Sequence, residues 1–444
     1  MQEKGLINGL TLFCFLHILL VSYLRKKRTM VNTPAKFRIK LSLYINYFVF
    51  AILLNSVGIV ILKSQKVYGV DELAASTLEL FKDLPIAIVS FLMASFLPRI
   101  GYKRSMLIAL ALVTVACISM YFGNSFWSAK ILFACVGAAF ALIKVSVYSV
   151  IGLLTRNESE HNSLMSSIEG VFMFGIALAY FIFPAFNSEM NENAWLNVYW
   201  LLAGLSLLSF IFLYFSSFEE GQEIPGSDLA DDFKQMFLLM LKLTVLVFVV
   251  SAFLFVMVEQ GIMTWLPTFN DKILNLPENI AIMMASILAV SLGIGRLVAG
   301  QLAKRFHWVW ILSICIVIAM ALVVVVLPKA INAEELVINS FRDIPMIGYI
   351  FPLVGLFIAP IYPLLNSVIL SALPKKMHSP MSGLIIIFSA IGGTLGSRLI
   401  GYLFKNVGGD KAFYYLLIPM TMMLICFFIL NALTRKSNTN ESIA

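Results

Sequence analysis

The stretch ASFLPRIGYKR (94–104) closes a long apolar run with a basic turn, and it decides the fold. A related stretch, GQLAKRFHWVW (300–310), closes another apolar run in the second half of the chain. Both place small or apolar residues before a basic turn. A tight loop between packed helices needs this pattern, because small residues allow close approach and cationic side chains meet the carbonyl ends of helices. The pair indicates an internal repeat.

The composition shows what the apolar runs are. Of the 444 residues, 60% are hydrophobic and 13% are charged, whereas soluble domains carry about a quarter charged residues. Runs of about 20 apolar residues cross a bilayer as helices. We therefore predict an all-α polytopic membrane protein whose surroundings are a lipid bilayer. The net charge of +8 does not imply nucleic acid, because the basic residues lie in short loops.

The apolar runs predict twelve spans in two halves. A first half of six helices is expected at 41–217 and a second at 237–433, joined by the acidic linker 218–236. Residues 1–40 form an apolar segment with a basic stretch, and 434–444 a short tail. The predicted spans are 41–62, 74–98, 103–122, 126–154, 163–186, 195–217, 237–267, 279–303, 307–327, 343–372, 380–404 and 411–433.

Lysine and arginine gather in the loops on one side of these spans, and this bias sets the orientation. That side carries RKKR (25–28), the turn 99–104 and the basic pairs at 304–305, 375–376 and 435–436. We expect it to be cytoplasmic, with the C-terminus on the same side. The expected location is the plasma membrane, which in a bacterium is the inner membrane.

The N-terminus leaves two alternatives open. Residues 7–24 form a thirteenth apolar run that is followed at once by RKKR. It is either an additional helix, or translation begins at Met30 and leaves a short basic tail. A cleaved signal peptide is disfavoured, because its basic cluster would precede the apolar run.

The sequence gives no sign of an enzyme, a cofactor or a metal site. All five cysteines lie inside apolar runs without metal-ligand spacing, and the four histidines are scattered. There is no GxxxxGK[ST] nucleotide loop and no GxSxG or HExxH motif. A receptor built on a permease fold would be expected to carry a longer tail than 434–444.

The basic turns resemble the loop motif of the major facilitator superfamily, roughly G-x-x-x-D-R-x-G-x-R/K-R/K. The leading glycine is replaced by Ala94, and the aspartate by Pro98 in the first half and Lys304 in the second. The resemblance implies a major facilitator fold of two pseudo-symmetric six-helix halves. It also implies gating loops at the cytoplasmic side, with the matching residues Arg99, Gly101, Lys103, Arg104, Gly300 and Arg305.

Within this superfamily the chain is most similar to the fucose:proton symporter branch of sugar permeases. The resemblance rests on LNSVGIV (54–60), MVEQGIMTWLP (257–267), GLFIAPIYPLLNSVI (355–369) and SGLIIIFSAIGGTLG (382–396). In that branch, acids in spans one and four are tied to proton coupling. Here those positions hold Ser56 and Lys144, which puts coupling through the family's acids in doubt.

Lys144 is the most unusual residue of the predicted spans. A charge at mid-span costs about 2.5–3.5 kcal/mol on insertion scales, so it normally faces a partner or a wet cavity. At about 1.5 Å per residue, Lys144 and Glu169 lie at similar depths, which predicts an ion pair in the transport pathway. A structural pair or a snorkelling lysine is the alternative.

Further polar residues are candidates for the pathway. Glu259 is the acid of the second half, with Gln260 and Trp265 beside it as a hydrogen-bonding group and an aromatic face. Neutral candidates are Asn55 and Asn366. Arg296 is expected at the cytoplasmic gate, in the glycine-rich stretch that ends at Gly300, and Gly392 and Gly396 are expected to pack helices. The charges at Glu79, Lys82 and Asp83 are explained by an i,i+3 pair of Glu79 with Lys82 near the outer end.

We therefore predict a secondary transporter that works by alternating access between its halves. The expected substrate is a sugar or sugar derivative, with a proton as candidate coupling ion and a monomer as the working form. The alternative is a carrier of organic anions, amphiphiles or drugs, for uptake or efflux, in which Lys144 is the charge partner.

Overall fold

The computed structural model describes residues 33–155, 158–188, 190–216, 229–328, 341–344, 346–371, 373 and 377–441. The regular elements of this part are helices, apart from an isolated bridge between Ser188 and Asn191. The apolar run 7–24 and Met30 lie outside the described residues, as does much of the predicted linker.

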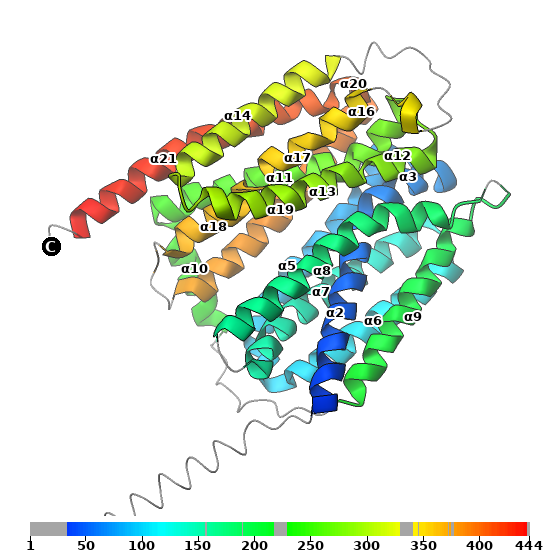
Figure 1. The fold of residues 1–444 in the computed structure, drawn as a ribbon, viewed down its shortest axis with the longest axis horizontal. Coiled ribbons are helices and arrows are strands. Elements are labelled where there is room, and N and C mark those ends of the chain that lie inside the picture. Colours follow the sequence, from blue (N-terminus) through cyan, green and yellow to red (C-terminus); the bar gives the residue numbers. More distant parts are fainter. Residues whose placement is uncertain are drawn as a thin grey trace, which may run out of the picture.

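The helices form two bundles (Figure 1). The first bundle contains α2 (Thr33–Asn55), α3 (Val57–Tyr68), α4 (Glu72–Ala75), α5 (Thr77–Ile100), α6 (Tyr102–Gly123), α7 (Phe126–Leu154), α8 (Glu158–Ala185) and α9 (Val198–Tyr214). The second contains α11 (Leu243–Lys272), α12 (Glu278–Met284), α13 (Ser286–Leu302), α14 (Trp308–Val326), α16 (Met346–Ile350), α17 (Val354–Ile358), α18 (Ile361–Ser371), α19 (His378–Asn406), α20 (Gly409–Ala412) and α21 (Leu417–Glu441).

Eleven helices of the described part are long and apolar enough to cross a membrane. The expected span at 74–98 is not among these eleven. It forms α5, a helix of 24 residues that packs along α7 and carries Glu79, Lys82 and Asp83. Charged groups inside a membrane span need partners. The partners of these three side chains are described with the candidate site below.

Several predicted spans are broken. The first span divides at Ser56 into α2 and α3, and the hydroxyl of Ser56 donates to the carbonyl of Leu53 at 2.8 Å. The tenth span divides at Ala359 and Pro360 between α17 and α18, since a proline lacks the backbone N–H that a helix interior needs. Such breaks are tolerated in a membrane where neighbouring helices cover the freed backbone groups.

Two sequence-based boundaries change. The last part of the expected linker is helical, because α10 (Leu229–Met240) begins within it. The expected tail is largely a continuation of α21, which runs to Glu441. Helix α10 lies at one end of the molecule and α3 and α12 lie at the other, and we call these the α10 end and the α12 end (Figure 1).

Small residues in α19 set its packing against α11. A Cβ on Gly392 would lie 2.4 Å from the carbonyl oxygen of Phe253, and one on Gly396 would lie 2.1 Å from that of Met257. Only glycine permits this approach, so the predicted role of Gly392 and Gly396 in helix packing is confirmed. The contact positions the stretch of α11 that carries Glu259 and Gln260.

Candidate functional site

A cavity of about 250 Å³ lies between the two bundles. It combines apolar and aromatic walls with several charged groups, a mixture that suits a small polar solute. The first bundle contributes Leu54, Asn55, Lys82, Asp83, Ile86, Phe140, Lys144, Phe172, Met173 and Ile176. The second contributes Glu259, Gln260, Met263, Ala289, Leu292 and Arg296.

Lys144 lines this cavity from α7, and its nearest described partner is aromatic. The ammonium lies 5.8 Å from the ring centroid of Phe140, within cation–π range. The predicted ion pair with Glu169 is not formed. Glu169 instead accepts a hydrogen bond of 2.8 Å from the hydroxyl of Tyr148, one helical turn further along α7. Among the described side chains, no acid lies within ion-pairing distance of Lys144, which lines the cavity without an ion-pair partner there.

Glu259 does form an ion pair, with a residue expected elsewhere. Arg296 Nη2 lies 3.0 Å from Glu259 Oε1, which joins α13 to α11. Arg296 Nη1 also lies 3.8 Å from Met173 Sδ on α8 of the first bundle. The structure therefore places Arg296 in the lining of the central cavity, where its guanidinium pairs with the acid of α11.

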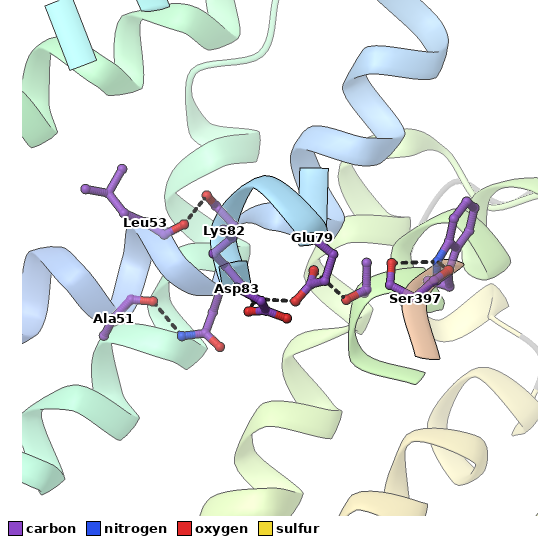
Figure 2. Close-up of polar contacts among 10 residues, drawn as sticks. Ala51, Leu53, Glu79, Lys82, Asp83 and Ser397 are labelled. Atoms are coloured by element: carbon purple, nitrogen blue, oxygen red, sulfur yellow. Dashed lines mark hydrogen bonds and ion pairs between the residues drawn. The ribbon is translucent and has the colours of Figure 1, made fainter. Parts of the chain in front are cut away.

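A second charged cluster lies on α5, where the sequence suggested an ordinary pair near the outer end (Figure 2). Lys82 Nζ contacts Glu79 directly and lies 3.6 Å from Asp83 Oδ1. Thr264 of α11 donates to Glu79 Oε2 at 3.2 Å. Glu79 is fully buried, and Lys82 and Asp83 are 4% and 7% exposed. Three charges within five residues of one predicted span were the signal that could have revealed this cluster.

The neutral candidates divide between the cavity and the helix packing. Asn55 lines the cavity at the break after α2 and donates to the carbonyl of Ala51 at 2.8 Å. Gln260 also lines the cavity. Trp265 does not, since its indole donates to the backbone carbonyl of Ser397 at 2.8 Å and is fully buried between α11 and α19. Asn366, on α18, is not part of the cavity lining.

The basic turns show different local structures. Gly101 adopts a positive φ of 87° before α6, a conformation that favours glycine. Lys103 donates to the carbonyl oxygens of Tyr214 and Ser216 at 3.0 and 2.6 Å, and so caps the end of α9. Arg104 and Arg305 are exposed, a Cβ on Gly300 would meet no neighbour, and the side chain of Arg99 lies outside the described part.

Ion pairs join the two bundles at the α12 end. Lys66 of α3 lies 2.6 Å from Asp271 of α11, and Lys272 of α11 lies 2.6 Å from Glu72 of α4. Lys63 of α3 contacts Glu278 of α12, and Lys405 of α19 lies 2.8 Å from Asp71. The hydrogen bond from Lys405 lowers the pKa of Asp71 below its usual value. These contacts hold the bundles together at this end.

The geometry suits the binding of a small solute between the two bundles. The cavity lies between bundles that meet through α5 and α19, α3 and α11, and α8 and α13. Within the described residues, no group of three or more histidine, cysteine or acidic side chains could hold a metal ion.

Comparison with known proteins defines the family. The model of the Major Facilitator Superfamily matches residues 41–397. No curated protein matches the chain. The fold is similar to that of a transporter of the POT family in complex with a thioalcohol-conjugated peptide (TM-score 0.70, 12% identity, 90% of this chain and 96% of that chain covered). It is also similar to a bacterial homologue of the human lysosomal transporter Spinster in an inward-facing, occupied conformation (0.66, 12%, 89% and 96%).

A variant of the E. coli fucose:proton symporter is a further structural neighbour (TM-score 0.60, 14% identity, 88% of this chain and 98% of that chain covered). At these identities the structures show the fold alone. The match over 41–397, the apolar helices in two bundles and the cavity between them are the features of one family. The chain belongs to the Major Facilitator Superfamily.

Proposed function

We propose that the protein is a secondary active transporter that carries a small anionic organic solute, such as an acidic sugar derivative, through the central cavity by alternating access. The proposal rests on the surroundings of Lys144. This lysine lines the cavity, with its ammonium near the ring of Phe140 and no described acid within ion-pairing distance. A carboxylate or phosphate on the solute would supply the missing partner.

The remaining cavity groups suit the rest of such a solute. Asn55 and Gln260 offer hydrogen-bonding groups for hydroxyls, and Phe140 and Phe172 offer ring faces. The aromatic pair lies 6.0 Å apart between centroids and is stacked. The similarity in fold to a fucose:proton symporter and to a nucleoside transporter supports a small hydroxylated solute.

The test compares two sugars that differ by one carboxylate, D-galacturonate and D-galactose, on purified protein. Thermal stabilisation is measured for the wild type, for Lys144→Met and for the matched control Lys130→Met. Lys130 lies on the same helix but stacks on the rings of Phe126 and Trp127, away from the cavity. We expect D-galacturonate to stabilise the wild type and Lys130→Met, but not Lys144→Met.

Two other results would change the proposal. Stabilisation of both the wild type and Lys144→Met by D-galactose would favour a neutral sugar, bound through Asn55 and Gln260, with Lys144 in a structural role. Stabilisation by neither sugar, combined with binding of a lipophilic anion, would favour a carrier of amphiphiles or drugs. In that case the apolar walls of the cavity would make most of the contacts with the bound anion.

The orientation and assembly complete the proposal. We propose a monomer in the plasma membrane, the inner membrane of a bacterium, with the α10 end and the C-terminus in the cytoplasm. The support is the excess of lysine and arginine in the loops of that side. A reporter enzyme that is active only in the cytoplasm, fused after Ala444, should be active, and an inactive fusion would reverse the orientation.

A further inference from the structure

We infer that Asp83 is the proton-binding group of this transporter, and that a proton on Asp83 and an anionic solute at Lys144 favour each other's binding. The coupling between the two depends on the proposed function, whereas the proton site itself does not. The inference rests on the position of Asp83. This aspartate of the first bundle lines the cavity and also contacts α19 of the second bundle.

The charges of the cluster on α5 do not balance. Lys82 contacts Glu79 and lies 3.6 Å from Asp83, so one lysine serves two carboxylates. The cluster is buried, and if all three groups are ionised it carries a net charge of −1 in a membrane interior, where an unbalanced charge is costly.

The contacts select Asp83 as the carboxylate that takes up the missing positive charge. Glu79 contacts Lys82 directly and accepts a hydrogen bond from the hydroxyl of Thr264, and it does not line the cavity. Asp83 lies further from Lys82, at 3.6 Å, and lines the cavity, which gives protons a route to it.

Other neighbours of the cluster do not alter this balance. Tyr180 of α8 lies close enough to Glu79 for their charges to interact, but a tyrosine hydroxyl is neutral at physiological pH. On α19, Asp83 meets Gly393 and Thr394, which are not titratable.

The contact with α19 connects protonation to movement of the bundles. A Cβ on Gly393 would lie 2.7 Å from Asp83 Oδ2, so the carboxylate in this position lies directly against the backbone of α19. Thr264 of α11 reaches the same cluster through Glu79. When the bundles move apart, the surroundings of Asp83 change, and so must its affinity for a proton. An anion at Lys144 adds negative charge to the same cavity and strengthens that affinity, and by linkage the proton strengthens anion binding.

The first test needs no solute. The infrared absorption of protonated carboxyl groups is followed during a pH titration of the wild type, of Asp83→Asn, of Glu79→Gln and of the matched control Asp71→Asn. We expect a carboxyl band that grows on acidification through neutral pH and shifts when aspartate is labelled with ¹³C. It should persist in Asp71→Asn and be lost in Asp83→Asn. In Glu79→Gln the band should appear only at lower pH. Lys82 then has Asp83 as its single carboxylate partner, and this favours the ionised form of Asp83.

A wild-type protein without the band, a band that ¹³C-aspartate does not shift, or a band that persists in Asp83→Asn would overturn the inference. The isotope test keeps the question answerable if Asp83→Asn does not fold.

The second test measures the affinity for D-galacturonate against pH. For the coupling of one proton, the affinity of the wild type should rise by up to about tenfold per unit of acidification, and that of Asp83→Asn should not depend on pH. An equal pH dependence in both proteins overturns the coupling. If neither D-galacturonate nor D-galactose binds, the proposed function fails, and the infrared titration alone decides the proton site.

Discussion

Arg296 and Glu259 form a 3.0 Å ion pair that ties α13 to α11 at the wall of the central cavity. The side chain of Glu259 is 11% exposed and that of Arg296 is 35% exposed, so removal of either partner leaves the other charge poorly solvated. The two residues are separated by 37 positions in the sequence. Their pairing defines how the two helices of the second bundle meet beside the cavity.

The pair can be tested by a double-mutant cycle. Glu259→Gln and Arg296→Met should each lower stability by about 1.5–3 kcal/mol, the range for hydrogen bonds to charged groups. The double variant should be more stable than the sum of the two losses predicts, because no charge is left unpaired. Thermal unfolding in detergent measures all three variants, and additive losses would show that the pair contributes nothing.

The ion pairs at the α12 end should keep that end closed. Lys66→Gln removes the contacts with Asp271 and Glu278, and Lys272→Gln removes the contact with Glu72. Partly exposed pairs contribute about 0.2–1 kcal/mol each, so each change should increase opening about 1.5- to 5-fold. The measurement is the rate at which a membrane-impermeant thiol reagent, added from the α12 side, modifies Met263→Cys in a background without the five native cysteines.

Lys411→Gln serves as the control for this experiment, because Lys411 lies on α20 at the same end without an ion pair among the described residues. Equal labelling rates in the control and in Lys66→Gln would show that loss of a surface charge has the same effect as loss of the pairs.

The pair between Asp71 and Lys405 predicts a pH dependence. Because Lys405 lowers the pKa of Asp71 in the folded protein, the stabilisation is present above the unfolded pKa of about 3.9 and is lost as the pH falls through the lower folded pKa. Both groups are exposed, so the effect should be small. Asp71→Asn should unfold at a slightly lower temperature than the wild type at pH 7, and the difference should disappear at about pH 3. A difference that stays constant with pH would refute the assignment.

The approach of α19 to α11 should be sensitive to a single methyl group. Gly396→Ala places a Cβ where the carbonyl oxygen of Met257 lies 2.1 Å away, so overpacking should cost about 1–3 kcal/mol. The matched control is Gly300→Ala, in which the new Cβ meets nothing within 4 Å. This control should be neutral or slightly stabilising, since alanine favours a helix. Equal unfolding temperatures for the two variants would contradict the packing.

Local patterns predicted much of the fold. The apolar run at 126–154 coincides with α7, and the glycines at 392 and 396 pack α19 on α11. These features depend on residues close in sequence, on helix length, or on the absence of a side chain. They can therefore be recognised without knowledge of what lies opposite.

The site was less predictable, because its contacts join distant residues. Matching depths suggested Lys144 and Glu169, but Tyr148 on α7 takes the carboxylate of Glu169. The partner of Glu259 proved to be Arg296, whose sequence context indicated a gate. Depth along a helix can be counted from the sequence, whereas the rotation of each helix about its axis depends on packing. That rotation decides which side chains meet.

The ion pairs of the α12 end have a consequence for the surroundings of the cell. The side chains of Lys66, Lys272 and Lys405 are 37%, 37% and 42% exposed, so dissolved ions reach these pairs. Salt shortens the range of charge interactions to about 8 Å at physiological ionic strength and to about 3 Å at 1 M. With the α12 end facing outward, as proposed, a saline medium weakens closure there, whereas dilute fresh water strengthens it. The salinity of the habitat would then help to set which way the empty carrier rests.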